Sequence, residues 1–515
     1  RGVAGSPAAG GLVLLGGGGS NAPEGLRSVA ALMGALGTGA DLVGEVPLAR
    51  WDASEVGLPG DSELMAARMR AGAFLLHADR FDAAAFGISS REASAMDPQQ
   101  RLLLETSYDA MHLAGGTRAS LMRSATGVAV ALYSLEYGLI YGESVRGRSA
   151  YAVTAASLAV AAGRISYAYG LNGPCRAIET GCSAGLVAAH AASQSLALGE
   201  SSAELAAGVN LLLTPRGAIG SAAAGMTSAS GKCHVFDARA DGFVKAEAVA
   251  AAVLAPAAAG GGSAFSTPKG AAVRYLGSGV EQDGRSASLL APNGAAQVGL
   301  MARAARRAGI DAGAVTLLEA HGTGTALGDP VEMRSVAAHG RPPSDAGPPA
   351  GGRRLITGGK ANYAHSETAA GLQGMLKLLH ALASGAVAPN AQLRVSSPHI
   401  ASICTPANHL LPSQLCAAPP PAPPGETLRS GGVNSFGYAG TIAHALLSAP
   451  AAAAGLRAAP APPTYTHVCY LWRPETHPLI AGPAATRSGR LVFHTPTLAA
   501  LRQMLDGHRV RGQPV

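Results

Sequence analysis

The sequence predicts an α/β layered fold, because strand-like and helix-like segments alternate along it. Hydrophobic, β-branched runs at 126–134 (TGVAVALYS) and 314–322 (AVTLLEAHG) have the composition of buried strands. Runs at 98–115 and 295–309 have the length and pattern of helices. Such alternation is typical of sheets covered by helices. At about 100–200 residues per domain, the chain can hold two to four domains.

The composition argues against a membrane protein and against a metal site. Hydrophobic residues make up 48%, but aromatics are only 4% and Gly reaches 68, so small residues dominate. The most apolar stretch, 246–262, is alanine-rich and interrupted by Pro256, which does not suit a membrane span. The six cysteines show no CxxC spacing, so we expect neither zinc nor disulfides, and a cytoplasmic, reducing location. The chain begins at Arg1, and targeting is therefore not assigned.

The net charge of +7 raises the question of nucleic acid. The densest basic group, RAARRAG at 303–309, has no interleaved aromatics and fits a solvated helix face. We expect no nucleic-acid partner, and a basic surface suits an acidic protein equally well.

Gly, Pro and Ser clusters mark the connections between the folded segments. Two of them, 256–270 and 417–428, are predicted as loops, and 448–465 is predicted as an inter-domain linker. The glycine run within 10–25 lacks the Lys-Ser/Thr of a phosphate-binding loop, so we predict a strand that ends in a flexible turn.

One cysteine stands where a helix is predicted to begin. Cys182 precedes the small-residue run SAGLVAAHAASQSLALG, in which Ser183 can help start the helix. The N–H groups and positive dipole end of a helix favour a thiolate, the form that attacks carbonyl carbon. A buried, inert cysteine explains this position equally well when it is taken alone.

Two histidine motifs favour chemistry at that cysteine. EAHGTGTALGDPVE (319–332) carries His321 after a predicted strand, and GGKANYAHSETAAG (358–371) carries Lys360, His365 and Glu367 before a predicted helix. Together they suggest a nucleophile with electrophilic helpers.

The motifs resemble those of one enzyme family. Seven of them occur in one order over residues 96–447: MDPQQRLLLETSYDAM, IETGCSAG, FDARADGF, QDGRSASLLAPNGAAQ, EAHGTGTALGDPVE, KANYAHSETAAG and NSFGYAGTIAHALL. This series resembles the β-ketoacyl synthase domain of polyketide synthases. The resemblance implies a thiolase-like fold with two similar α/β halves, 1–255 and 256–447, in α-β-α-β-α layers.

The resemblance also implies roles for individual residues. Cys182 would accept the acyl chain, His321 and His365 would drive decarboxylation of a malonyl-type extender, and Lys360 with Glu367 would form a supporting pair. Thr323 and Thr325 would contact the pantetheine arm. The gating loop would be Gly437, Tyr438, Ala439 and Gly440, and the N–H groups of Cys182 and of this loop would form the oxyanion hole.

The same resemblance implies the partners and the rival functions. Acyl and malonyl-type thioesters would arrive on the phosphopantetheine of an acyl carrier protein, with no bound cofactor, and the domain would be a homodimer. The alternatives are a fatty acid 3-oxoacyl synthase and a degenerate, non-catalytic scaffold. A thiol hydrolase is disfavoured, because no third group orients a water-activating base.

Several positions depart from the family pattern. Ile442 stands where Asn is usual, Ala439 and Ala364 where Gly is usual, Ala361 for Ser, and Tyr438 for the gating Phe; Ala246-Glu247-Ala248 replaces Gly-Glu-Gly. An isoleucine offers none of the hydrogen bonds of an amide, so we expect a looser, shifted gating loop.

The last fifty residues have a different character. Within residues 466–515, the segment 477–515 begins with HPLI and resembles the opening of a polyketide dehydratase, and His508 and Gly512 have the HxxxG spacing of that family. The segment is equally compatible with an ordinary tail, and the half motif predicts no dehydration from this chain.

Overall fold

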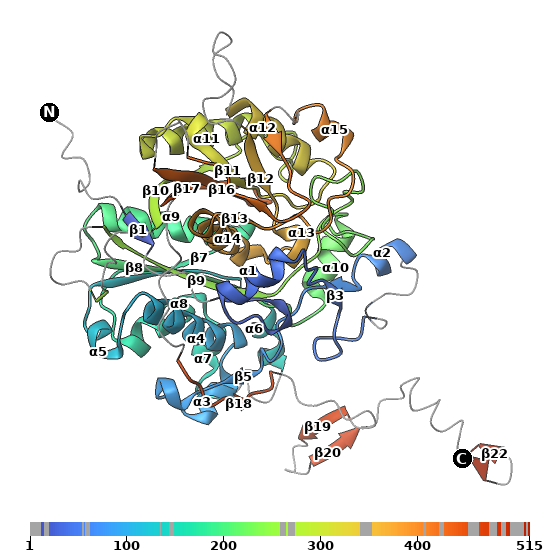
Figure 1. Cartoon of the computed structure of the whole chain (residues 1–515). Coiled ribbons are helices and arrows are strands. Elements are labelled where there is room, and N and C mark those ends of the chain that lie inside the picture. Colours follow the sequence, from blue (N-terminus) through green and yellow to red (C-terminus); the bar gives the residue numbers. More distant parts are fainter. Residues whose placement is uncertain are drawn as a thin grey trace.

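In the computed structural model, layers of strands and helices are stacked on one another (Figure 1). The structure describes residues 12–14, 20–53, 56, 62–133, 135–143, 149–257, 264–265, 273–339, 353–404, 408–421, 427–451, 463–472, 481–485, 491–494, 509–510 and 513–514.

Among the described residues, twelve strands form one sheet, and eleven of them follow one continuous hydrogen-bonded path. Its order is β14 (His409–Leu410), β12 (Arg354–Thr357), β11 (Val315–Glu319), β16 (Leu428–Phe436), β17 (Thr441–Pro450), β10 (Val273–Gln282), β1 (Leu12–Leu14), β9 (Ala248–Pro256), β8 (Ala203–Asn210), β6 (Thr126–Ala131) and β7 (Cys175–Ile178), with β2 (Ser20–Asn21) beside β9. The short β1 is antiparallel to both β10 and β9 and so joins the two halves of the path.

The two halves of the sheet form two layers, and helices lie outside and between these layers (Figure 1). The outer helices beside β10, β11 and β17 are α11 (Gly294–Ala308) and α12 (Gly328–His339), and those on the opposite outer face are α4 (Pro98–Leu113) and α8 (Leu158–Tyr169). Between the layers lie α9 (Ala184–Ala197) and α14 (Ala370–Ser384). This is the α-β-α-β-α arrangement that the sequence predicts.

The predicted elements coincide with the observed ones where local chemistry is decisive. The runs at 126–134 and 314–322 contain β6 and β11, and those at 98–115 and 295–309 contain α4 and α11. Asn293 caps α11 by accepting from the N–H groups of Ala295 and Ala296, and Gly309 ends it with φ 67°. Caps and glycine stops of this kind are local signals, which is why sequence alone locates them.

The remaining elements are shorter and lie around these layers. They are α1 (Val29–Gly37), β3 (Gly44–Glu45), α2 (Glu63–Ala67), β4 (Ala71–Gly72), β5 (Arg80–Phe81), α3 (Ser90–Ala95), α5 (Arg118–Leu121), α6 (Leu135–Glu143), α7 (Ala152–Ala155), α10 (Arg216–Ala223), α13 (Lys360–Tyr363), β13 (Ala386–Val387), α15 (Pro398–Ala401) and β15 (Cys416–Ala417).

The end of the folded body differs from the predicted boundaries. Residues 448–450, predicted as linker, are the last residues of β17, and 463–472 form a strap that returns to the N-terminal half. In the strap, β18 (Val468–Cys469) pairs with β5. The strap is held by distant partners, which a local reading of composition does not reveal.

One face of α4 holds this strap. Arg101, Glu105 and Asp109 are spaced four residues apart and therefore share a helix face. Arg101 donates to the Tyr470 carbonyl (2.7 Å), His467 contacts Glu105 (3.1 Å) and the Tyr465 hydroxyl donates to Asp109 (2.9 Å).

Beyond the strap, four short strands are described. They pair as β19 (Ala481–Ala485) with β20 (Leu491–His494), and as β21 (Arg509–Val510) with β22 (Gln513–Pro514). His508, the candidate dehydratase histidine, lies outside the described residues. Within the part of the chain that the structure describes, no helix has the length and apolarity needed to span a bilayer.

Candidate active site

Cys182 lies where the sequence places it, at the start of a helix. It sits in a tight 3-10 turn, Gly181–Ser183, that leads directly into α9. Gly181 has φ 62°, a conformation that suits glycine and lets the chain turn sharply after β7. Ser183 occupies the N-cap position, but its hydroxyl bonds to Thr180 (2.9 Å) and does not cap the helix. Cys182 is partly exposed.

Two glycines let α9 and α14 approach closely. A Cβ on Gly185 would lie 2.9 Å from the Thr368 carbonyl oxygen, and one on Gly371 would lie 2.9 Å from the Leu186 nitrogen. Any larger residue would force these backbones apart. The close approach brings the N-terminal ends of the two helices together, and with them Cys182 and His365.

The two histidines converge on the cysteine. His365 Nε2 lies 2.9 Å from Cys182 Sγ, and the rings of His321 and His365 stand 5.6 Å apart at 88°. His321 follows β11, and His365 lies in the turn before α14. The structure thus joins three motifs separated by up to 183 residues.

The environment of His321 fixes which ring nitrogen carries its proton. The backbone N–H of Phe436 donates to His321 Nδ1 (3.2 Å), so neutral His321 carries its proton on Nε2. Glu332 accepts the N–H of His321 (2.7 Å) and of Gly322 (2.8 Å), which holds the loop backbone. His321 is therefore prepared to donate a hydrogen bond from Nε2.

Burial controls the charge state of the site. Desolvation, and to a smaller extent the nearby Glu367, raise the pKa of Cys182 to about 12 against the opposing effects of Lys360, Lys245 and the N–H of Tyr438. Burial, reinforced by Lys360, holds the pKa of both His321 and His365 well below the usual value. The effect of burial on Cys182 thus outweighs the helix start, which favours a thiolate. At rest, Cys182 is a neutral thiol beside the neutral imidazole of His365.

This charge state predicts the pH dependence of Cys182 alkylation. A thiol with a pKa of about 12 is almost wholly protonated near neutrality. In a His365→Ala variant no base lies against the sulfur and only the free thiolate reacts, so we expect the alkylation rate with iodoacetamide to rise about tenfold per pH unit between about pH 7 and 9. In the wild type, neutral His365 takes the thiol proton, and the rate should vary less with pH. Peptide-resolved mass spectrometry measures both rates. A plateau below pH 8 in His365→Ala would contradict a thiol pKa of about 12.

The expected supporting residues have separate partners. Lys360 donates to the His321 carbonyl oxygen, whereas Glu367 forms an ion pair with Lys245. Thr323 and Thr325 lie together, with their hydroxyl oxygens 3.2 Å apart, beside His321 in sequence.

The predicted gating loop stands over the cysteine turn. Gly437 donates to the Thr441 carbonyl (2.7 Å) and Gly440 to the Gly437 carbonyl (2.9 Å). The ring of the exposed Tyr438 would lie 3.1 Å from a Cβ on Gly181. A Cβ on Gly437 would lie 2.5 Å from the Thr180 carbonyl oxygen, so this glycine permits the close approach.

Two residues at this loop, Ile442 and Ala439, differ from the family pattern and still fit the surrounding structure. Ile442 is fully buried and packs with Leu300 and Phe436. Ala439 is exposed, and its carbonyl oxygen accepts from Gln282 Nε2 (2.8 Å). At this position apolar packing and backbone hydrogen bonds take the place of the contacts of an amide.

Two acidic residues of the site, Asp329 and Glu332, were not predicted from the sequence. Asp329 accepts the N–H groups of Thr323 and Gly324 (both 3.1 Å) and of Phe236 (2.9 Å), and burial raises its pKa to about 7. Asp329 and Glu332 both stand in the GDPVE segment of the His321 motif. The signal that could have identified them is a pair of carboxylates close behind a Gly-rich loop, where they can accept the N–H groups of the loop backbone.

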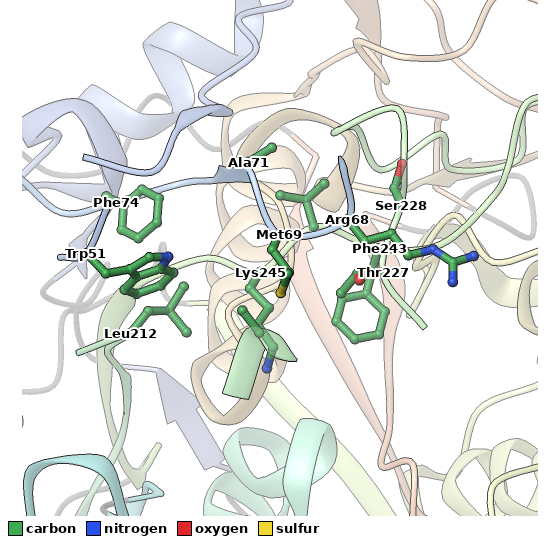
Figure 2. A pocket seen from close by; sticks show the side chains of 12 residues that line it. Trp51, Arg68, Met69, Ala71, Phe74, Leu212, Thr227, Ser228, Phe243 and Lys245 are labelled. Atoms are coloured by element: carbon green, nitrogen blue, oxygen red, sulfur yellow. The ribbon is translucent and has the colours of Figure 1, made fainter. Parts of the chain in front are cut away.

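A small recess borders the site (Figure 2). Its lining runs from Trp51, Phe74 and Leu212 to Thr227 and Phe243, with Lys245 among them. Among the described residues, no cluster of His, Cys, Asp or Glu is suited to hold a metal ion.

Comparisons with known families identify the two halves of the fold. The β-ketoacyl synthase N-terminal domain model matches residues 13–259, and the C-terminal domain model matches 272–394. Among solved structures, the oxazolomycin ketosynthase domain KS7 of Streptomyces albus JA3453 superposes with a TM-score of 0.76 at 30% identity, covering 89% of this chain and 75% of that one. The module 6 ketosynthase of the bacillaene synthase of Bacillus subtilis 168 gives 0.74 at 29%, covering 85% and 72%.

Curated relatives are much longer than this chain. The phthioceranic/hydroxyphthioceranic acid synthase of Mycobacterium tuberculosis is 38% identical over 453 residues, which is 86% of this chain and 20% of that protein. A mycocerosic acid synthase-like polyketide synthase of Mycolicibacterium smegmatis is 38% identical over 434 residues, 82% and 19% respectively. This chain thus spans about a fifth of these relatives. It belongs to the β-ketoacyl synthase family, as a ketosynthase domain of the polyketide synthase kind.

Proposed function

We propose that the domain transfers an acyl group from an acyl carrier protein to Cys182 and then condenses it with a malonyl-type extender. The observation that carries this proposal is the 2.9 Å contact between His365 Nε2 and the Cys182 sulfur. A neutral imidazole at that distance can accept the thiol proton as the sulfur attacks.

Acyl transfer is the first step. The Cys182 sulfur bonds to the thioester carbonyl carbon, its proton passes to His365 Nε2, and the pantetheine thiol leaves with that proton. The N–H groups of Cys182 and Tyr438 would hold the tetrahedral oxyanion. The N–H of Tyr438 already faces the sulfur.

Condensation is the second step. The extender loses CO2, and the electron pair of the broken C–C bond becomes an enolate whose oxygen accepts from His321 Nε2–H and from His365 in its Nε2–H tautomer. The enolate carbon attacks the Cys182 thioester, a new C–C bond forms, and the Cys182 thiolate leaves and takes a proton from solvent. The product is a 3-oxoacyl thioester on the carrier.

The substrate carrier and the oligomeric state are part of the proposal. Phosphopantetheine arms would pass Thr323, Thr325 and the exposed Tyr438. A homodimer is supported by β7, which in the described sheet pairs only with β6 and so leaves an edge for a second copy.

Two other functions were considered. The polyketide relatives favour the polyketide reaction over fatty acid condensation. A non-catalytic scaffold is disfavoured, because Cys182, His321 and His365 are all present, His365 Nε2 lies 2.9 Å from the Cys182 sulfur, and the two histidine rings stand 5.6 Å apart.

Intact-protein mass spectrometry tests the proposal. We expect the wild type, incubated with an acyl thioester, to gain one acyl mass that is lost on adding malonyl carrier protein, with release of CO2. Cys182→Ala will gain no acyl mass, and Cys416→Ala, which removes a partly buried cysteine of β15 outside the site, will behave as wild type. No adduct with several chain lengths would favour the scaffold.

A further inference from the structure

The turn that carries His365 has an unusual backbone. Ala364 has φ 61° and ψ −168°, a region that essentially only glycine adopts, and Glu367 has φ 43°. Ala364 is fully buried, and it stands where the related synthases usually carry glycine. Such a conformation persists only when surrounding contacts impose it.

Residues 243–246 clamp the backbone of His365. The His365 N–H donates to the Val244 carbonyl (2.8 Å), and the His365 carbonyl accepts from the Ala246 N–H (2.9 Å). The Phe243 ring meets the His365 ring edge-on at 5.2 Å. These contacts hold His365 itself, but they do not reach the far end of the turn at Glu367.

Lys245 reaches that far end. Its side chain is 9% exposed and forms an ion pair with the carboxylate of Glu367. The other acidic group near Lys245 is Glu136 of α6, whose carboxylate accepts the N–H groups of Leu213 (2.7 Å) and Thr214 (2.9 Å). Glu367 is thus the carboxylate that Lys245 holds, and one segment secures both ends of the turn.

We propose that Lys245 is a positioning residue: through Glu367 it holds the strained turn closed and so keeps His365 Nε2 against the Cys182 sulfur. Its catalytic consequence rests on the proposed function, whereas the positioning itself does not. The clamp is needed here because Ala364 makes the turn costlier than glycine would.

Three variants test this inference through alkylation of Cys182, which needs no acyl substrate. Lys245→Met keeps the stem, which lines the recess with Met69 and Leu212, and removes the cation (Figure 2). We expect it to lower the alkylation rate about 10- to 100-fold, the scale of a misplaced catalytic group. Lys245→Arg will restore most of that rate, and so will Ala364→Gly in the Lys245→Met background, because it relieves the turn.

Matched controls separate positioning from loss of fold. Lys232→Met breaks another lysine–carboxylate pair, with Asp41, and should leave the Cys182 rate unchanged. The exposed Cys469 of the strap should react alike in all variants. Near-ultraviolet circular dichroism will confirm native packing.

Each remaining outcome decides the inference. If Ala364→Gly fails to restore the rate, Lys245 acts by its charge on the thiol, and the inference is overturned; an unchanged rate in Lys245→Met overturns it as well. With acyl thioesters, the loss should appear in kcat at constant KM. If alkylation follows these expectations while no acyl adduct forms on the wild type, the proposed function fails and the positioning role stands.

Discussion

Replacing His365 with alanine will slow acyl transfer to Cys182 by about 10²–10⁴-fold, the usual contribution of a positioned general base. The reason is the charge state of the site. The Cys182 thiol has a pKa of about 12, so its proton must pass to a base during attack, and in the proposed reaction His365 Nε2, 2.9 Å away, takes it. Single-turnover acylation followed by mass spectrometry measures the rate.

His321→Ala separates the two steps of the reaction. His321 does not contact the thiol, so acylation should stay near the wild-type rate while CO2 release falls about 10²–10³-fold, as expected when one oxyanion donor is lost. His380→Ala, in the later part of α14, is the matched histidine control and should alter neither step. Equal loss of both steps in His321→Ala would contradict this division of roles.

Lys377→Met will lower the free energy of unfolding by about 3–5 kcal/mol, because it leaves a buried carboxylate without its cation. Lys377 of α14 pairs with Glu319 at the end of β11, and each side chain is 4% exposed. Glu319 also accepts the Thr357 hydroxyl and the Gly359 N–H (2.7 Å). Chemical denaturation monitored by tryptophan fluorescence and circular dichroism measures the loss.

A double variant and a surface control complete this test. Glu319→Gln with Lys377→Met removes both charges and should recover part of the stability. Arg303→Met breaks a more exposed pair with Glu281 and should cost less than about 1 kcal/mol. A similarly small loss in Lys377→Met would show that the buried pair adds little to the fold.

Much of the site follows from the sequence because its signals are local. The cysteine at a helix start and the two histidines beside Gly-rich turns lie within short motifs, and their order along the chain indicates the family. Local sequence also predicts four of the main elements, because their residues favour one conformation: the strands β6 and β11 and the helices α4 and α11. Each depends mainly on neighbours within a few residues.

Other features arise only when distant segments meet. Glu367 was expected beside Lys360, but its ion-pair partner is Lys245, 122 residues earlier in the chain. The strap at 463–472 was expected as linker and tail, but it docks on α4, more than 350 residues away. No local pattern predicts which of many charged residues will be brought within hydrogen-bonding distance.

The sequence by itself therefore determined the fold class and the family, and it singled out Cys182, His321 and His365, which the structure brings together. Only the tertiary structure decided their charge states, the strain at Ala364 and the partner of Glu367. The physical reason is that conformational preference and motif spacing act over a few residues. Desolvation and ion pairing sum over everything that surrounds a group, and at Cys182 that sum outweighs the helix start that favours a thiolate.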